Sequence, residues 1–194
     1  MTRLGIFGGT FDPPHVGHLI VAADAFEALE LDRLVFVPAA DPPHKQGTVG
    51  ATGRQRLRML TAAVDGDARF AVDDLEIRRG GTSYTVDTLR EIRGREPDAE
   101  LVFLLGIDQF RALASWREPA EVARLAQLAV FSRGGETPDL TGPYEGVHVP
   151  VSRIDVSSTD VRRRLSQGLS VRYYVAETVR TIIEEERIYS SFEF

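Results

Sequence analysis

The chain has 194 residues, 43% of them hydrophobic and 27% charged, which is typical of one globular domain, and we expect that domain to span residues 1–194. The net charge of −6 disfavours a nucleic-acid partner, because nucleic-acid-binding proteins usually carry a basic face. The sequence contains no cysteine, no signal-peptide pattern and no apolar run near the ~18 residues that a membrane span needs. We therefore expect a cytoplasmic protein without a membrane partner.

Short apolar runs alternate with amphipathic stretches along the chain. The apolar runs predict strands at residues 4–7, 34–37, 101–105 and 128–131. An imperfect alternation predicts a further strand at residues 70–77, and residues 147–151 are also β-like. The amphipathic stretches predict helices at residues 15–29, 54–64, 84–92, 119–125 and 175–187. This alternation predicts an α/β fold of the doubly wound, Rossmann-like type, with a parallel sheet and helices on both faces. Ligands of such folds bind at the carboxyl ends of the strands.

A glycine-rich turn with two histidines follows the first predicted strand, in the sequence GGTFDPPHVGH at residues 8–18. Gly8 and Gly9 allow a tight turn and a close approach to a ligand. His15 and His18 stand three residues apart in the first turn of the next helix, so both can face the same side. A helix amino terminus also favours anions. The segment predicts an anion site with two imidazoles, and it lacks both the His-Glu-x-x-His pattern of zinc sites and a serine elbow.

The basic residues include one outlier. The chain has 22 arginines and a single lysine, Lys45, which lies in the sequence DPPHK at residues 41–45. This sequence is part of a loop rich in glycine, proline and threonine at residues 39–53, and a similar loop occupies residues 134–146. Such loops are either substrate lids or surface insertions. Because a compact ammonium differs functionally from a guanidinium, we interpret Lys45 as a phosphate ligand.

A second candidate anion site lies nearer the carboxyl end, at VSSTDVR (residues 156–162). Ser157 or Ser158 can cap the helix that begins there. The remaining hydroxyls, including that of Thr159, suit phosphate oxygens, and Arg162 lies one turn into the helix, where it can add charge-assisted hydrogen bonds. Taken alone, the segment is more typical of an ordinary capped helix with solvated arginines.

Both segments resemble known signatures. Residues 8–18 resemble the motif of the nucleotidyltransferase superfamily that shares His-x-Gly-His with class I aminoacyl-tRNA synthetases, and residues 156–162 resemble its Ile-Ser-Ser-Thr-x-x-Arg motif, with Val156 in place of isoleucine. The resemblance implies that His15 and His18 bind ATP phosphates and stabilise the transition state. The ATP-binding residues that it implies here are Gly8, Gly9, Thr10, Phe11, Ser157, Ser158, Thr159 and Arg162.

Three further segments resemble those of bacterial nicotinate-nucleotide adenylyltransferases. They are the loop at residues 41–45, TSYTVDT at residues 82–88, and GIDQF at residues 106–110 followed by Trp-Arg at residues 116–117. The resemblance implies that N–H groups at a helix start and the Thr85 hydroxyl meet the nicotinate carboxylate, and that Trp116 stacks on the pyridine ring. It adds Gly106 and Asp108 to the ATP-binding residues. Tyr84, Thr85, Trp116, Arg117 and Arg133 become the expected substrate-binding residues, with Arg133 also suited to phosphate or adenine.

The resemblance implies an adenylyltransferase of NAD biosynthesis, in which nicotinate mononucleotide attacks the α-phosphorus of ATP in line and gives deamido-NAD and pyrophosphate. Lys45 would join the two histidines as a catalytic residue, and Mg²⁺ would bind through the ATP phosphates without a dedicated protein cage. The alternatives are a phosphopantetheine adenylyltransferase, a cytidylyltransferase, and a nucleotide sensor without turnover. A homo-oligomer is compatible with the sequence, which does not set the oligomeric state.

Overall fold

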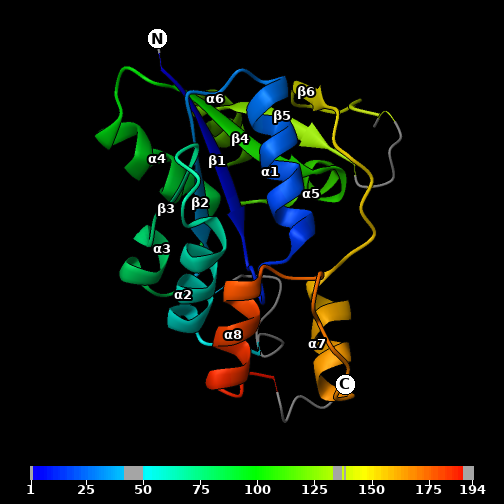
Figure 1. Cartoon of the computed structure of the whole chain (residues 1–194). Helices are drawn as coiled ribbons and strands as arrows, with labels where there is room; N and C mark the ends of the chain where they lie inside the picture. Colours follow the sequence, from blue (N-terminus) through cyan, green and yellow to red (C-terminus); the bar gives the residue numbers. More distant parts are fainter. Residues whose placement is uncertain (1, 42–49, 133–136, 138, 190–194) are drawn as a thin grey trace.

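We analysed a computed structural model, which describes residues 2–41, 50–132, 137 and 139–189 (Figure 1). Six strands form one sheet in the order β3-β2-β1-β4-β5-β6, and every neighbouring pair is parallel. The strands are β1 (Arg3–Gly9), β2 (Arg33–Pro38), β3 (Phe70–Val72), β4 (Glu100–Gly106), β5 (Gln127–Phe131) and β6 (Gly146–Val149). The strand order reverses between β1 and β4, so a crevice for ligands is expected at their carboxyl ends.

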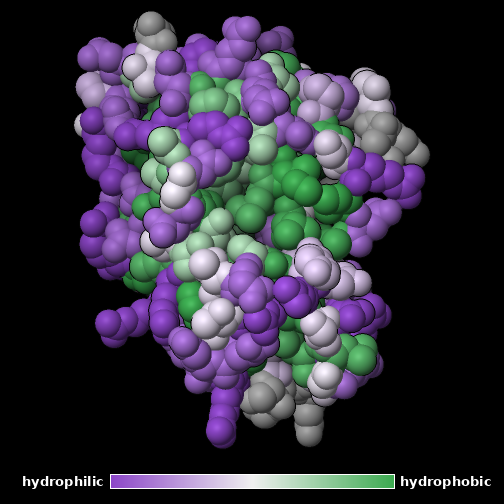
Figure 2. Space-filling view, in the orientation of Figure 1, coloured by the Kyte–Doolittle hydropathy of each residue, from purple (hydrophilic) through white to green (hydrophobic). Residues whose placement is uncertain are grey.

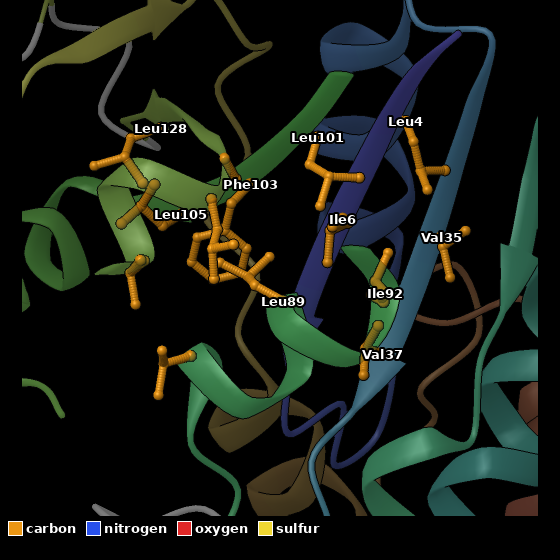
Figure 3. Packing of buried hydrophobic residues seen from close by; sticks show 14 of the residues in the cluster. Leu4, Ile6, Val35, Val37, Leu89, Ile92, Leu101, Phe103, Leu105 and Leu128 are labelled. Atoms are coloured by element: carbon orange, nitrogen blue, oxygen red, sulfur yellow. The ribbon is translucent and has the colours of Figure 1, made fainter. Parts of the chain in front are cut away.

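Helices cover both faces of this sheet. They are α1 (Val16–Ala28), α2 (Gly53–Val64), α3 (Leu75–Arg79), α4 (Thr85–Arg95), α5 (Ile107–Ala112), α6 (Pro119–Leu125), α7 (Ser158–Ser166) and α8 (Glu177–Glu185), with a 3₁₀ turn η1 (Leu113–Ser115). One buried cluster joins α3, α4 and α6 to one face, and Figure 3 shows Leu89 and Ile92 of α4 packed against Ile6 and other strand residues. A second cluster joins α1 and α2 to the other face. The doubly wound parallel fold is confirmed.

A smaller core lies at the carboxyl end of the sheet. There α8 packs on α2, and Met59 of α2 shares a buried cluster with Val161 of α7 and Ile182 of α8. Figure 1 shows α7 and α8 beyond the tip of β1. The C-terminal helices therefore stand beside the crevice that the sheet creates.

The surface in the same orientation is mostly hydrophilic, as expected for the outer sides of amphipathic helices (Figure 2). Hydrophobic side chains show near the middle of this view, over α1, where Leu19 and Ile20 are half-buried. No helix among the described residues is long and apolar enough to span a membrane.

The strand predicted at residues 70–77 is wrong in its second half, because β3 ends at Val72 and α3 begins at Leu75. The Asp73 carboxylate accepts a hydrogen bond from the N–H of Leu75 at 3.0 Å, which turns the backbone out of the sheet. Leu75 and Glu76 are then buried as the first turn of a helix. This difference proves important for the site, because Glu76 reaches the cavity described next.

Candidate active site

A cavity of about 760 Å³ lies at the carboxyl ends of β1, β4 and β5. Its volume falls in the range of small-molecule sites, which is about 300–1,000 Å³. Eleven of the residues predicted from the sequence line it: Gly8, Gly9, Thr10, Phe11, His18, Tyr84, Thr85, Gly106, Asp108, Trp116 and Arg117. Segments that are far apart in the sequence thus meet in one cavity at the switch point of the sheet.

Five predicted residues that the structure describes do not line this cavity. His15 is buried behind the glycine turn, and Ser157, Ser158, Thr159 and Arg162 lie on and just before α7. Lys45 and Arg133 lie outside the described residues.

The tight turn after β1 depends on Phe11, whereas the sequence predicted that Gly8 and Gly9 would form it. Phe11, not Gly8 or Gly9, has a positive φ, of 50°. A left-handed backbone costs a non-glycine residue roughly 1–3 kcal/mol, and the buried Phe11 ring packs edge-on against Phe7 and Phe36, which hold it in place. Gly9 is needed for space, because a Cβ there would lie 2.8 Å from the Phe11 ring.

The two histidines lie ring against ring at the start of α1. His15 is the N-cap residue, and its ring centroid lies 3.7 Å from that of His18. The backbone N–H of His15 donates to Nδ1 of His18 at 3.2 Å, so a neutral His18 carries its proton on Nε2. Gly17 makes room for this pair, since a Cβ there would lie 3.0 Å from Nδ1 of His15 and 2.9 Å from Ile154.

The second predicted anion segment is bound directly to the first. Ser157 caps α7 by accepting a hydrogen bond from the N–H of Asp160. Ser158 donates its hydroxyl to the carbonyl of Pro13 at 2.9 Å, and Arg162 donates to the carbonyl of Asp12 at 2.7 Å. The start of α7 is therefore fixed beside the turn that carries both histidines.

Asp12 is a buried centre of hydrogen bonds within this turn. Its carboxylate accepts from the N–H groups of Gly50 and Ala51, at 2.8 and 3.0 Å, and from the Tyr189 hydroxyl at 2.7 Å. Burial, together with the neighbouring carboxylate, raises the pKa of Tyr189. The guanidinium of Arg162 lies 3.7 Å from the same carboxylate. Asp12 thus connects the histidine turn to the C-terminal segment.

Arg56 of α2 is a second buried group that the sequence analysis missed. Its side chain is 1% exposed and donates to three backbone carbonyls, those of Thr10, Ala40 and Ala51. Burial lowers its pKa, and the charge of Asp12 partly opposes that shift. Arg56 therefore joins the glycine turn to the chain segments on either side of residues 42–49.

The opposite end of the cavity is built from α4 and the turn η1. Tyr84 is the N-cap of α4 and makes no side-chain cap; its carbonyl accepts from the N–H of Asp87 at 3.1 Å, and the N–H groups of Thr85 and Val86 precede that first bond. Trp116 is half-buried and packs edge-on against Phe103 at 6.3 Å between ring centroids. The Arg117 guanidinium lies 4.8 Å above the Tyr84 ring and 3.5 Å from Asp87. This end offers aromatic surface, hydrogen-bond donors and positive charge.

Fold and site together define a nucleotidyltransferase. The chain matches the model of the cytidylyltransferase-like family over residues 6–164. It is 45% identical over 187 residues to a Thermus thermophilus protein described as a probable nicotinate-nucleotide adenylyltransferase, covering 96% of this chain and 99% of the relative. A Shouchella clausii protein of the same description is 42% identical over 190 residues, with 97% of each covered. The chain belongs to the nicotinate-nucleotide adenylyltransferase family.

The fold has solved counterparts at low sequence identity. The structure of Plasmodium falciparum nicotinic acid mononucleotide adenylyltransferase complexed with NaAD matches with a TM-score of 0.77 at 18% identity, covering 97% of this chain and 98% of that one. The same Plasmodium enzyme complexed with APC matches with a TM-score of 0.76 at 20% identity, with the same coverage. At these identities, the likeness concerns the fold.

Proposed function

We propose that this protein transfers the adenylyl group of ATP to the phosphate of nicotinate mononucleotide, giving deamido-NAD and pyrophosphate. One observation carries the proposal: a single cavity joins the glycine turn and His18 at one end to the start of α4 and Trp116 at the other. Membership of the nicotinate-nucleotide adenylyltransferase family supports the same reaction. We place the reaction in the cytoplasm, where ATP is available; self-association stays a prediction.

The chemistry needs positioning and charge stabilisation rather than a protein nucleophile. The acceptor phosphate is already ionised, so it can attack the α-phosphorus without a general base. His18 can donate from Nε2 to the phosphate oxygens that gain charge in the transition state, because its Nδ1 accepts from His15. We expect the start of α7, with Arg162, to receive the outer phosphates, and we propose that Lys45 joins them.

Magnesium enters this proposal with ATP. A hard cation that keeps several waters is bound mainly by the β- and γ-phosphates and reduces the charge that the protein must neutralise. Within the described parts of the chain, no group of three or more His, Cys, Asp or Glu side chains is placed to hold a metal. The hydrogen-bond donors of this cavity, His18 among them, suit phosphate oxygens.

The proposed acceptor can be tested by direct competition among substrates. We expect kcat/KM to be roughly 10- to 100-fold higher for nicotinate than for nicotinamide mononucleotide, because an amide NH₂ set against the N–H donors at the start of α4 leaves those donors unpaired at a cost of about 1–3 kcal/mol. Pyrophosphate release is measured with both nucleotides and with phosphopantetheine, each with ATP and with CTP. Equal values for the two mononucleotides, or faster turnover of phosphopantetheine, would reject the assignment.

The Trp116→Ala variant should separate the two substrates. Stacking on an aromatic side chain contributes roughly 1–3 kcal/mol, so we expect the KM for nicotinate mononucleotide to rise about tenfold or more while the KM for ATP stays within about twofold. Trp116→Phe keeps an aromatic face and should recover most of the loss. A parallel rise for both substrates would show that Trp116 supports the cavity without stacking on the acceptor.

A further inference from the structure

Glu76 is a buried carboxyl in the wall of the cavity to which the proposed reaction gives no role. It lies in α3, which links β3 to the segment before α4, and only 7% of it is exposed. It lines the same cavity as Tyr84, Thr85 and Trp116. A buried carboxyl beside the proposed binding site of another carboxylate requires a physical explanation.

The contacts of Glu76 connect it to the start of α4. The Thr88 hydroxyl donates to Oε1 of Glu76 at 2.5 Å, and Arg79 in turn donates to that hydroxyl at 3.1 Å. Ser83 shares a side-chain hydrogen bond with Glu76, and its Oγ accepts from the N–H of Ala40 at 2.9 Å. Glu76 therefore fixes the segment that precedes α4 against the end of β2.

The positive charges around Glu76 do not fully compensate for the cost of burying its ionised carboxylate. Arg79 of α3 and Arg56 of α2 act on it, but Arg56 is bonded to backbone carbonyls, while Arg79 also contacts Glu91 at 3.4 Å. Burial raises the pKa of Glu76, opposed in part by the hydrogen bonds from Ser83 and Thr88 and by the two arginines. The carboxyl thus releases its proton less readily than a carboxyl in water.

We propose that Glu76 determines acceptor specificity: it positions the start of α4 through Ser83 and Thr88, and it takes up a proton from solvent when the ring carboxylate of the acceptor enters the cavity. The inference rests on the proposed function. Two carboxylates in one cavity repel, and Glu76 is buried, so the acceptor binds better to the form in which Glu76 is neutral. Binding and protonation are then reciprocal, and the bound acceptor favours the protonated carboxyl.

The sign of the pH effect follows from this linkage. Below the pKa of Glu76 in the free enzyme the carboxyl is already neutral, and the acceptor binds with full affinity. As the pH rises above that pKa, binding must also supply a proton, so the KM for nicotinate mononucleotide rises. If the acceptor raises the pKa of Glu76 by about one unit, the KM rises about tenfold. Nicotinamide mononucleotide has the same phosphate but no ring carboxylate, so this part of the rise should be absent.

The wild-type protein provides the first test. Calorimetric titrations in two buffers of different ionisation enthalpy give the protons taken up on binding, with nicotinate and nicotinamide mononucleotide compared at the same pH. Proton uptake by the phosphate and by the histidines is common to both nucleotides. The difference in proton uptake between the two nucleotides therefore reports the effect of the ring carboxylate. We expect greater uptake with the nicotinate nucleotide, and equal uptake would overturn the inference.

Two matched variants assign the proton to Glu76. Glu76→Gln keeps a hydrogen-bond acceptor but does not titrate, so its KM for nicotinate mononucleotide should lose the alkaline rise and fall below that of the wild type there. Glu91→Gln removes a half-buried carboxylate that also contacts Arg79 and should leave the profile unchanged.

Other outcomes are equally decisive. A Glu76→Gln profile that follows the wild type, or a rise in KM for both substrates at every pH, would leave Glu76 as a structural residue only. If the wild type fails to turn over nicotinate mononucleotide, the proposed function itself is rejected. Normal turnover without extra proton uptake rejects only the role of Glu76.

Discussion

The His18→Ala variant is expected to lose about 100- to 1,000-fold in kcat, because one donor to the charge of a transition state contributes roughly 3–4 kcal/mol. His18 is the member of the histidine pair that lines the cavity, and its Nδ1 accepts from the N–H of His15, so we expect the Nε2 proton to be the one that acts on substrate. The loss is measured as pyrophosphate release with both substrates saturating. Turnover within a few fold of the wild type would contradict the catalytic role.

Alanine also removes the acceptor that His18 offers to the start of α1, and loss of a helix cap costs about 0.5–2 kcal/mol of stability. His18→Asn separates the two effects, since its amide oxygen can replace Nδ1 while nothing replaces Nε2. We expect near-wild-type unfolding and the full loss of kcat in this variant. His148→Ala, on the edge strand β6, is the control for loss of an imidazole outside the cavity and should keep its activity.

The sheet was predictable because strands buried on both faces are continuous apolar runs. The run at residues 101–105 lies within β4, and that at residues 4–7 lies within β1. Short helices were not predictable in this way. A helix of five residues, such as α3, completes too few turns to show a 3.6-residue period, and the turn at Asp73 that begins it has no apolar signature.

Motifs located the residues of the cavity but not their arrangement. The glycine turn and the start of α4 come together through the strand order, which a parallel fold makes predictable. The docking of Ser158 and Arg162 on the carbonyls of Pro13 and Asp12 was not predictable, because it joins residues about 150 positions apart through backbone atoms. Spacing alone also did not show which of the two histidines would reach the cavity, because both lie at the start of α1. In the structure His18 lines the cavity, whereas His15 is only 1% exposed and does not line it.

The burial of Arg56 did leave a signal in the sequence. Arg56, Met59 and Leu60 follow helical spacing, and all three are buried on one face of α2. Because arginine is rarely buried without partners, its position on an apolar helix face indicates that hydrogen-bond acceptors surround it in the protein interior. Those groups are three backbone carbonyls, which hydrophobic patterning does not reveal.

Arg56→Leu is expected to lower the free energy of unfolding by about 3–5 kcal/mol. Leucine fills much of the space but leaves the carbonyls of Thr10, Ala40 and Ala51 without the donors that Arg56 supplies, and it removes the positive charge near buried Asp12. For a chain of this length, such a loss lowers Tm by about 10 °C. Thermal and denaturant unfolding followed by circular dichroism measure it.

Arg58→Leu is the matched control, since Arg58 lies two residues further along α2 with its side chain 53% exposed and paired with Glu185 and Glu186. Exposed ion pairs contribute at most about 1 kcal/mol, so this variant should unfold close to the wild type. Arg56→Lys tests the geometry, because one ammonium cannot reach three carbonyls held at different points of the turn and should recover only part of the stability. If Arg56→Leu and Arg58→Leu lost the same free energy of unfolding, the cause would be the packing of leucine on α2. The buried guanidinium of Arg56 would then not be what holds the glycine turn.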